Sequence, residues 1–329
     1  MMMGSQRVHR HSLSFLYPSL ARLRSLGEAE ARKDDGPLVV SEAFDVIVLN
    51  WRLPGFFTHL WDRASLRICA DGALNRIAAW AGCRGFGLFQ RISTTSAERA
   101  GWLPDVVVGD LDSADGELVE RLVREHGGRR IAVDAGPVAG MTYDARAGVW
   151  ANVDVSGIRP GQPPWIVRVP DQNSSDISKC IAMWQHIPRH KRSSTLCIVG
   201  SFGGRMDHQI AHLQALYAFS DPADSIVLLG DASASLLLHG STQDCAVENV
   251  IHHRWGEYEG SYCALVPLVP CRSVTTKGLV WNLHNEPLRF GKGGLVSTSN
   301  KIDPQSHVVS VRTDEPLVWM IGIPSASEP

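Results

Sequence analysis

The segment PDVVVGDLDSADGELVERLVREHG, residues 104–127, contains the two patterns that decide the fold. Its first half is a run of valines closed by a glycine and two aspartates, which predicts a buried strand ending in a polar turn. Its second half spaces apolar residues at helical intervals as far as Gly127, which predicts an amphipathic helix. A buried strand followed at once by such a helix is the repeating unit of an α/β domain.

The same strand–loop–helix unit recurs on both sides of this segment. The further predicted strands are FDVIVLN (44–50), LRICAD (66–71), PWIVRVP (164–170), TLCIVG (195–200) and SIVLLG (225–230). Helices are predicted near 57–66, within DGALNRIAAWAG (71–82), near 175–187 and near 207–219. Strands that alternate with helices indicate a parallel sheet covered on both faces, so residues 44–234 are expected to form an α/β domain.

Residues 235–329 show a different pattern. The helical period disappears, and short β-rich runs such as SHVVSVRT (306–313) alternate apolar with polar residues between turns. We therefore expect a C-terminal, all-β antiparallel sandwich.

Two segments stand outside these domains. Residues 134–165 contain nine Gly or Pro and are interpreted as a surface insertion, with MTYDARAGVWANVDV (141–155) as a hairpin within it and an active-site lid as the alternative. Residues 1–43 are expected to be a flexible N-terminal extension. Its arginines and serines, without an acid before Glu28, also resemble an organelle transit peptide, which is the less favoured interpretation.

Composition excludes several classes of protein. The 329 residues carry 32 Lys+Arg against 34 Asp+Glu, and a net charge of −2 argues against a general nucleic-acid or membrane-surface binder. The seven cysteines form no C-x-x-C pair, so they are interpreted as buried, reduced residues of a cytoplasmic protein. No apolar run reaches the ~18 residues of a membrane-spanning helix.

Acidic residues follow three of the predicted strands. They are Asp71 in CADG, Asp110 and Asp112 in GDLDS, and Asp171 and Asp176 in PDQNSSDISK. The carboxyl ends of parallel strands face one crevice, so these side chains are expected to gather there. Aspartate is also common in turns and helix caps, which is the alternative. A divalent cation would relieve the repulsion between them, and oxygen ligands suit Mg²⁺.

A glycine-rich loop, GSFGGRMDH (200–208), lies between a predicted strand and a predicted helix. Gly200, Gly203 and Gly204 would let backbone N–H groups approach a phosphate, and Arg205 would add a positive charge. The loop matches neither the Walker A pattern nor G-x-G-x-x-G, so alone it is a weak signal.

Two other features have competing interpretations. His208 and His212 are one helical turn apart, but without H-E-x-x-H they are interpreted as helix-face or packing residues rather than metal ligands. Trp281 lies in a Thr- and Asn-rich strand, TTKGLVWNL. It is either a core residue or an exposed indole that binds a flat or cationic ring.

Taken together, these motifs resemble those of the thiamine pyrophosphokinase family, particularly its eukaryotic form. The matching stretches occur in the expected order: LWDRASLRICADGALNRI, PDVVVGDLDS, PDQNSSDISKCI, GSFGGRMDHQIAHLQALY, CALVPLVPCRSVTTKGLVWNL, RFG with GLVSTSN, and PLVWMI. They cover most of residues 44–323. The resemblance implies an N-terminal α/β domain, a C-terminal β-sandwich and a homodimer.

The resemblance also implies the reaction and the site residues. The reaction is Mg²⁺-dependent transfer of a pyrophosphoryl group from ATP to the thiamine hydroxyl, which releases AMP. Asp71, Asp110, Asp112 and Asp176 would form the catalytic set, and Asp110, Asp112 and Asp176 would bind Mg²⁺. The ATP-binding residues implied are Gln172, Lys179, Gly203, Gly204, Arg205 and Asp207. Thiamine would be bound at the subunit interface by Trp281, Ser297, Ser299 and Asn300.

Departures from the family pattern leave alternatives open. The usual DGGAN is DGALN here, so the loop will differ if Ala73 must adopt a positive φ. The usual DQD pattern is DQN, and Asn173 removes one charge. The rival functions are a Mg²⁺-dependent pyrophosphoryl transferase with another acceptor, and a catalytically weak homologue that binds thiamine or a nucleotide.

Overall fold

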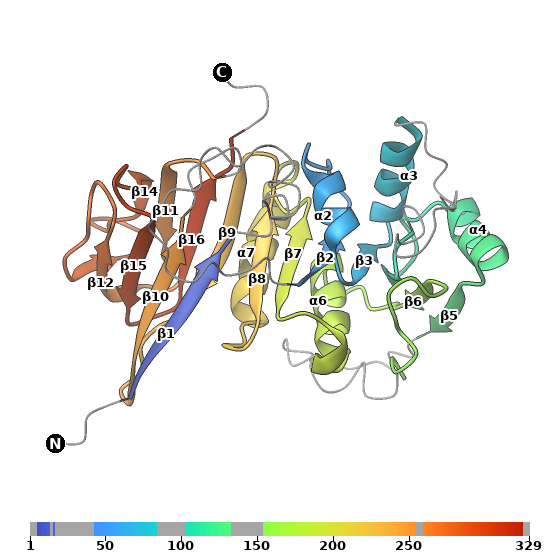
Figure 1. The fold of residues 1–329 in the computed structure, drawn as a ribbon, viewed down its shortest axis with the longest axis horizontal. Helices are drawn as coiled ribbons and strands as arrows, with labels where there is room; N and C mark the ends of the chain where they lie inside the picture. Colours follow the sequence, from blue (N-terminus) through green and yellow to red (C-terminus); the bar gives the residue numbers. More distant parts are fainter. Residues whose placement is uncertain are drawn as a thin grey trace, which may run out of the picture. The chain divides into compact units, whose positions relative to one another are not determined.

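The computed structural model describes residues 5–13, 16, 43–83, 103–132, 154–253 and 259–324 (Figure 1). The chain divides into two compact units. One is residues 43–231, called here the α/β unit. The other, called the β unit, combines residues 232–329 with the N-terminal segment that precedes residue 43.

The α/β unit contains a parallel sheet with the strand order β8-β7-β2-β3-β4-β6-β5. Its strands are β2 (Phe44–Val48), β3 (Arg67–Ala70), β4 (Val106–Gly109), β5 (Arg129–Ala132), β6 (Trp165–Arg168), β7 (Thr195–Val199) and β8 (Ser225–Leu229). Its helices are α2 (Phe57–Arg63), α3 (Ala73–Cys83), α4 (Gly116–His126), α6 (Asp176–His186) and α7 (Met206–Ala218), with a 3₁₀ turn at Arg189–Lys191.

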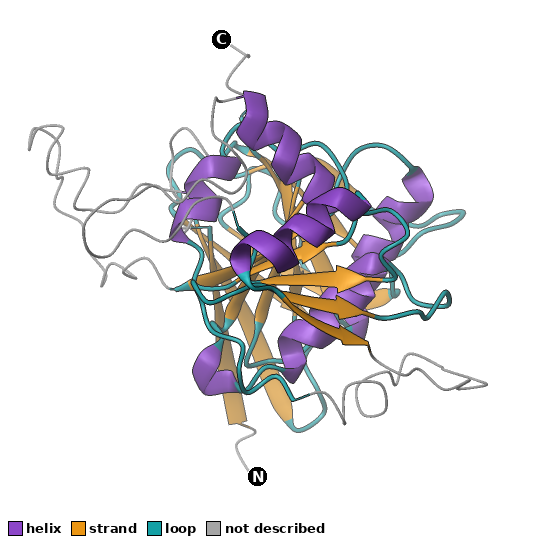
Figure 2. Ribbon diagram, turned by 90° about the vertical axis from the view of Figure 1, so that its right-hand side faces the viewer, coloured by secondary structure: helices purple, strands orange, loops and turns teal. Residues whose placement is uncertain are grey.

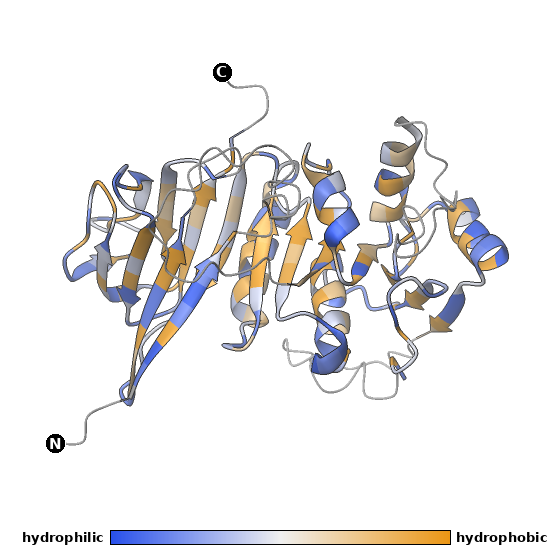
Figure 3. Ribbon diagram, viewed as in Figure 1, coloured by the Kyte–Doolittle hydropathy of each residue, from blue (hydrophilic) through white to orange (hydrophobic). Residues whose placement is uncertain are grey.

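The sequence pattern explains these elements. Every residue of β2, β3, β4 and β7 is buried, as expected for strands covered on both faces by helices (Figure 2). The central strands of this sheet are accordingly rich in hydrophobic residues (Figure 3). Helix α4 starts where the Asp115 side chain accepts a 2.8 Å hydrogen bond from the Glu117 N–H, and it ends at Gly127, whose φ is +66°. Both ends agree with the prediction from residues 104–127.

The β unit contains two sheets. One has the order β1-β10-β15-β12-β13, and the other contains β14-β11-β16-β9. The strands are β1 (Ser5–Ser12), β9 (Ser233–Leu238), β10 (Cys245–His252), β11 (Tyr262–Val266), β12 (Cys271–Lys277), β13 (Glu286–Leu288), β14 (Ser297–Lys301), β15 (Val308–Thr313) and β16 (Leu317–Gly322). All the pairings within these sheets are antiparallel except that of β1 with β10.

Strand β1 corrects the expectation that residues 1–43 form a flexible extension. Ser5–Ser12 pairs in parallel with Cys245–His252. The strand is polar overall, but His11 is only 7% exposed and its ring nitrogen lies 3.2 Å from the Asn249 side-chain oxygen. Leu13 and Leu16, just after the strand, are buried. This burial of two leucines and a histidine is the physical reason for the order.

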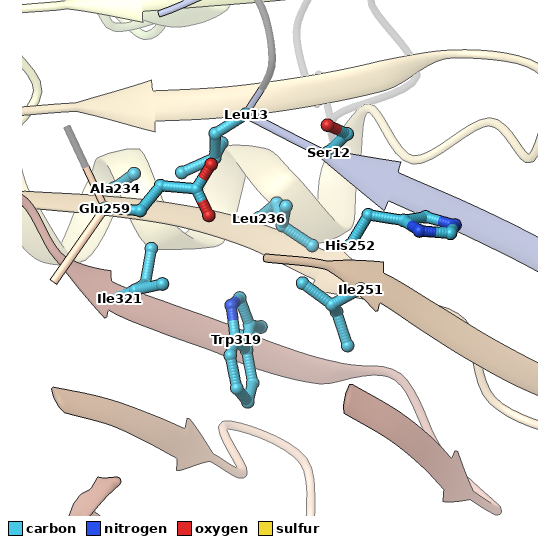
Figure 4. Close-up of a pocket in the computed structure, with 9 residues that line it drawn as sticks. All are labelled: Ser12, Leu13, Ala234, Leu236, Ile251, His252, Glu259, Trp319 and Ile321. Carbon is cyan, nitrogen blue, oxygen red and sulfur yellow. The ribbon is translucent and has the colours of Figure 1, made fainter. Parts of the chain in front are cut away.

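A narrow cavity lies between the two sheets of the β unit (Figure 4). Leu13 and Leu236 line it together with Trp319 and the carboxylate of Glu259. Glu259 is buried, and its Oε2 lies 2.9 Å from His253 Nδ1. The N-terminal segment therefore contributes to the core of the β unit.

The predicted fold class is confirmed, an α/β parallel-sheet unit followed by a β-rich antiparallel unit. Strands β1, β5, β9, β10 and β13 were not predicted from the sequence. The unit boundary falls between residues 231 and 232 rather than at 234. The hairpin predicted at 141–155 lies mostly outside the described residues.

Six cysteines are free. Cys69, Cys180, Cys197, Cys263 and Cys271 are buried, as predicted, whereas Cys245 is partly exposed. No helix in the described part of the chain has the length and apolar character needed to cross a membrane.

Candidate active site

Three carboxylates meet at the carboxyl ends of β3 and β4. Asp71, Asp110 and Asp112 each offer an oxygen, and these oxygens lie within 4.8 Å of one another. Leu111, between the last two aspartates, has a φ of +67°, a conformation that is uncommon for a residue with a side chain. This turn brings both flanking carboxylates into one group. Of the five aspartates predicted to gather at this edge, these three form the group, whereas Asp171 and Asp176 lie outside the set within 4.8 Å.

Asp71 is the buried member of the group. Its carboxylate accepts hydrogen bonds from the backbone N–H of Gly72 at 2.6 Å and of Leu111 at 3.0 Å. A Cβ on Gly109 would lie 2.6 Å from this carboxylate, so a glycine is required at the end of β4. Burial, with the charges of Asp176 and Asp110, raises the pKa of Asp71 to about 6.

Asp110 has positive and polar partners. Its Oδ2 accepts from Lys179 Nζ at 3.2 Å and from Gln172 Nε2 at 3.0 Å, which brings two of the six predicted ATP-binding residues to the acidic group. The Lys179 ammonium is almost fully buried. Burial alone would raise the pKa of Asp110, but hydrogen bonding with Asp112 and Lys179 lowers it to about 2.

Asp176 begins helix α6 beside the group but does not belong to the set within 4.8 Å. Burial raises its pKa, Lys179 opposes the shift, and Asp110 and Asp112 add to it. Ser175 caps the helix by accepting from the Ser178 N–H. Asp176 therefore contributes charge at the rim of the group.

The glycine loop follows β7. Gly200, Gly203 and Gly204 have φ values of +80°, +104° and +67°, conformations that glycine adopts without strain. Arg205 and Asp207 pair with each other, with Arg205 Nε 3.1 Å from Asp207 Oδ1, and both side chains are exposed. His212 lies 2.6 Å from the Ser201 carbonyl, which agrees with its interpretation as a packing residue.

Ala73 resolves one departure from the family pattern. Among the described residues with a side chain, only Leu111, Asn285 and Ser299 have a positive φ. Ala73 is fully buried at the start of α3 and needs no such conformation.

Three residues beside these groups were not predicted from the sequence. Trp51 follows β2 and packs on the glycine loop, and Asn50 packs on Gly72. Arg168 ends β6, and its Nε donates to the Asp110 carbonyl at 3.3 Å. Each follows or ends a strand at the sheet edge that carries the aspartates, and this position is the signal that could have identified them.

The β unit brings the predicted vitamin-binding residues together around Asn300. The buried Asn300 side chain donates to the Trp281 carbonyl at 2.9 Å and to Ser297 Oγ at 3.2 Å. Trp281 is 59% exposed, which contradicts its interpretation as a core residue. Ser299 is exposed, with a φ of +57°.

Family models match both units. The model for "Thiamin pyrophosphokinase, catalytic domain" matches residues 57–132 and 162–228, and that for "Thiamin pyrophosphokinase, vitamin B1 binding domain" matches residues 248–318. Thiamine pyrophosphokinase 3 of Oryza sativa subsp. japonica is 33% identical over 285 residues, which cover 85% of this chain and 87% of that protein. The chain belongs to the thiamine pyrophosphokinase family.

Other family members agree with this assignment, and the assignment carries thiamine pyrophosphokinase activity with it. Thiamine pyrophosphokinase 2 of Arabidopsis thaliana is 32% identical over 289 residues, 87% of this chain and 88% of that protein. The crystal structure of yeast thiamin pyrophosphokinase has the same fold, with a TM-score of 0.60 at 16% identity over 98% of this chain and 93% of that one. The catalytic-domain match omits residues 133–161, which largely coincide with the predicted insertion.

Proposed function

We propose that the acidic group and the glycine loop of the α/β unit together bind Mg²⁺ and ATP for the pyrophosphokinase reaction of this family. The observation that carries the proposal is the group of three carboxylates within 4.8 Å beside the buried Lys179. The acceptor is the thiamine hydroxyl, which attacks the β-phosphorus of ATP and displaces AMP.

The carboxylates fit a divalent cation. Asp71, Asp110 and Asp112 offer only oxygen ligands, as Mg²⁺ prefers. The pKa of Asp71 is raised mainly by burial, to which the charges of Asp176 and Asp110 add, and a bound cation would offset both effects. Bound Mg²⁺ would neutralise phosphate charge as the pyrophosphoryl group moves. Asp176 would hold a water or a phosphate-bound metal from the rim.

The chain's own cations and amides would orient the triphosphate. Lys179 and Gln172 both bond to Asp110 Oδ2, so they fix that carboxylate and stand beside the phosphates. The backbone N–H groups of Gly203 and Gly204 lie just before α7, where the helix dipole favours an anion. Arg205 adds a guanidinium, which Asp207 orients.

Trp281 supports a thiamine site in the β unit. Its exposed indole suits the positively charged thiazolium ring, and Ser297, Ser299 and Asn300 supply neutral hydrogen-bonding groups. We place this site at the interface of a homodimer. Exposed apolar side chains accompany Trp281 in the sequence, namely Val280, Phe290 and Leu295.

The direct test is product formation. Purified protein is incubated with ATP, Mg²⁺ and thiamine, and AMP and thiamine pyrophosphate are followed by chromatography. Both products should appear in equal amounts and should require thiamine. AMP formation that does not depend on thiamine would favour the rival with another acceptor, and no AMP at all would favour the catalytically weak homologue.

Mixing two impaired variants, assayed at a thiamine concentration well below the KM of Trp281→Ala, tests the shared site. In a dimer with each site built from both subunits, Asp112→Asn mixed with Trp281→Ala restores about a quarter of the sites, because one site of each heterodimer is intact. Sites contained within one subunit would give no recovery. The dimer itself is checked by light scattering after gel filtration.

The buried, free cysteines support a reducing compartment, and we propose the cytoplasm. Fractionation of cells that express the full chain with a C-terminal tag tests this. Recovery of the protein in an organelle fraction would contradict it.

A further inference from the structure

The turn after β2 lies between the two halves of the proposed nucleotide site. Asn50 and Trp51 form this turn, and β2 pairs with β3 on one side and with β7 on the other. Asp71 of the acidic group follows β3, and the glycine loop follows β7. A ligand that contacts both the carboxylates and the glycine loop would therefore lie next to Asn50 and Trp51.

Asn50 contacts the acidic side. A Cβ on Gly72 would lie 2.3 Å from Asn50 Nδ2, and Asn50 Oδ1 accepts from Arg76 Nε at 3.0 Å. Gly72 itself donates to the Asp71 carboxylate. Asn50 is therefore held against the turn that carries Asp71.

Trp51 contacts the glycine loop over most of the length of its ring. A Cβ on Gly203 would lie 2.3 Å from Trp51 Nε1, and a Cβ on Gly204 would lie 2.7 Å from Cζ3 and Cη2 at the other end of the indole. The backbone N–H of Trp51 also donates to the Leu49 carbonyl at 2.8 Å, which fixes the turn. The loop backbone and the ring are packed without intervening side chains.

Trp51 nevertheless stays 38% exposed. An indole that is held rigidly by the loop and remains open to solvent loses little conformational freedom when a flat ring stacks on it. The charged part of ATP is suited to the carboxylate-bound metal, to Lys179 and to the loop amides. The purine base, which is flat and largely apolar, is then the part of ATP without a partner among these groups. Trp51 is exposed, aromatic and packed on the loop, so it can supply that partner.

We propose that Trp51 stacks on the adenine base of ATP and so fixes the nucleotide at the end of the site away from the acidic group. This inference rests on the proposed function, since it assumes that the α/β unit binds ATP. It predicts that the indole strengthens binding of the adenine base and does not affect binding of the phosphates.

Binding of two ligands that differ only in the nucleoside part tests the stacking. The dissociation constants of ATP and of inorganic tripolyphosphate, each with Mg²⁺, are measured by calorimetry for the wild type, Trp51→Ala and Trp51→Phe. Trp51→Ala should weaken ATP binding by about 10-fold, whereas Trp51→Phe, which keeps a ring, should weaken it less than about 3-fold. Tripolyphosphate binding should change less than about 2-fold in either variant.

Two outcomes overturn the proposal. Equal weakening of both ligands in Trp51→Ala would mean that the indole acts only by supporting the loop. Unchanged binding of both would mean that it contributes nothing to the nucleotide. If Trp51→Ala does not fold, fluorescence decides: ATP should quench the wild-type emission, tripolyphosphate should not, and Trp51→Phe should lose the ATP signal.

Trp165→Phe is the matched control. Trp165 lies in the same unit but begins β6, so it is at the amino-terminal ends of the parallel strands, whereas Trp51 is at their carboxyl ends. Its replacement should therefore leave the ATP-induced quenching in place. Loss of quenching in Trp165→Phe but not in Trp51→Phe would overturn the proposal. These measurements need no turnover. A wild type that binds ATP but forms no AMP would contradict the proposed function and leave the stacking to be decided by the binding constants.

Discussion

Lys179 Nζ lies 3.2 Å from Asp110 Oδ2, and the two side chains are 3% and 15% exposed. This is an ion pair that spans two elements, α6 and the turn after β4. Lys179 is the only positive charge among the described residues that directly contacts Asp110 Oδ2. Without it, the carboxylates of Asp71, Asp110, Asp112 and Asp176 would repel one another more strongly. The pair therefore has a structural role as well as a role toward phosphate.

Lys179→Gln should show both roles. We expect a loss of about 2 kcal/mol in the free energy of unfolding, less than for a fully buried pair, because the Asp110 side chain keeps some exposure to solvent. The KM for ATP should rise at least about 10-fold, since a charge-assisted contact is lost. Denaturant unfolding and steady-state kinetics measure these effects. A variant with normal stability and a normal KM would contradict this account of Lys179.

Asp112→Asn should lower kcat at least ~100-fold, on the scale of losing a preorganised charge-stabilising group. The matched control is Asp115→Asn, three residues away, where the side chain caps α4 and asparagine caps equally well. Kinetics at saturating ATP, thiamine and Mg²⁺ compare the two. Near-normal turnover in Asp112→Asn would refute its metal-binding role.

Gly203→Ala should be much more damaging than Gly291→Ala. The two glycines have nearly the same φ, +104° and +103°, so alanine is strained at both positions. Only Gly203 faces an obstacle, the Trp51 ring, whereas nothing lies within 4 Å of the Cβ position at Gly291. Thermal unfolding of both variants should show the larger drop in Tm for Gly203→Ala. Adding Trp51→Ala should recover part of it, and equal drops would contradict the packing.

Trp281→Ala and Asn300→Ala should separate binding from stability. Trp281 is largely exposed, so its loss should raise the KM for thiamine at least about 10-fold while the Tm changes little. Asn300 is buried and bonds to the Trp281 carbonyl and to Ser297, so Asn300→Ala should also lower the Tm. A lower Tm for Trp281→Ala than for Asn300→Ala would contradict the description of this cluster.

His11 predicts that the β unit loses stability in acid. Burial lowers the pKa of His11 to about 4, with the charges of His239 and His9 adding to the effect and the Asn249 hydrogen bond opposing it. The unfolded chain takes up the proton near pH 6.5 and the folded chain only near pH 4. The free energy of unfolding should therefore fall between these values, by up to about 3 kcal/mol.

His11→Gln removes the titrating group and should flatten this part of the pH profile. Denaturant unfolding between pH 7.5 and pH 4 measures the difference from the wild type. An identical pH slope in the two proteins would rule out His11 as the cause. Other residues then would have to supply the acid sensitivity.

Residues 104–127 predict their strand and helix correctly because burial, capping and period all agree there. Strand β1 could not be predicted in the same way. Its sequence, SQRVHRHS, is polar, and it is a strand only because β10 accepts it in parallel and because Leu13 and Leu16 are buried just after it. Pairing between segments that are distant in the chain leaves little local signal.

In the site, too, some features have a local signal in the sequence and others depend on contacts between distant segments. Asp71, Asp110 and Asp112 were predicted because strand ends in a parallel sheet meet at one edge. The positive φ of Leu111, which brings Asp110 and Asp112 into one group, has no signal in the residue type. Trp51 was missed because an aromatic residue after a strand is usually a packing residue. Its relation to Gly203 and Gly204 appears only once β2 and β7 lie side by side.

The pairing of β1 with β10 also has a consequence for synthesis of the chain. His11 and Asn249, whose side chains meet in the folded protein, are 238 residues apart. The ribosome needs roughly 10 to 50 s to make that many residues, and the α/β unit emerges complete in that interval. Strand β1 must therefore wait, exposed and without its partner, until β10 leaves the exit tunnel. A bulky N-terminal fusion would delay this last step, whereas a C-terminal tag would not.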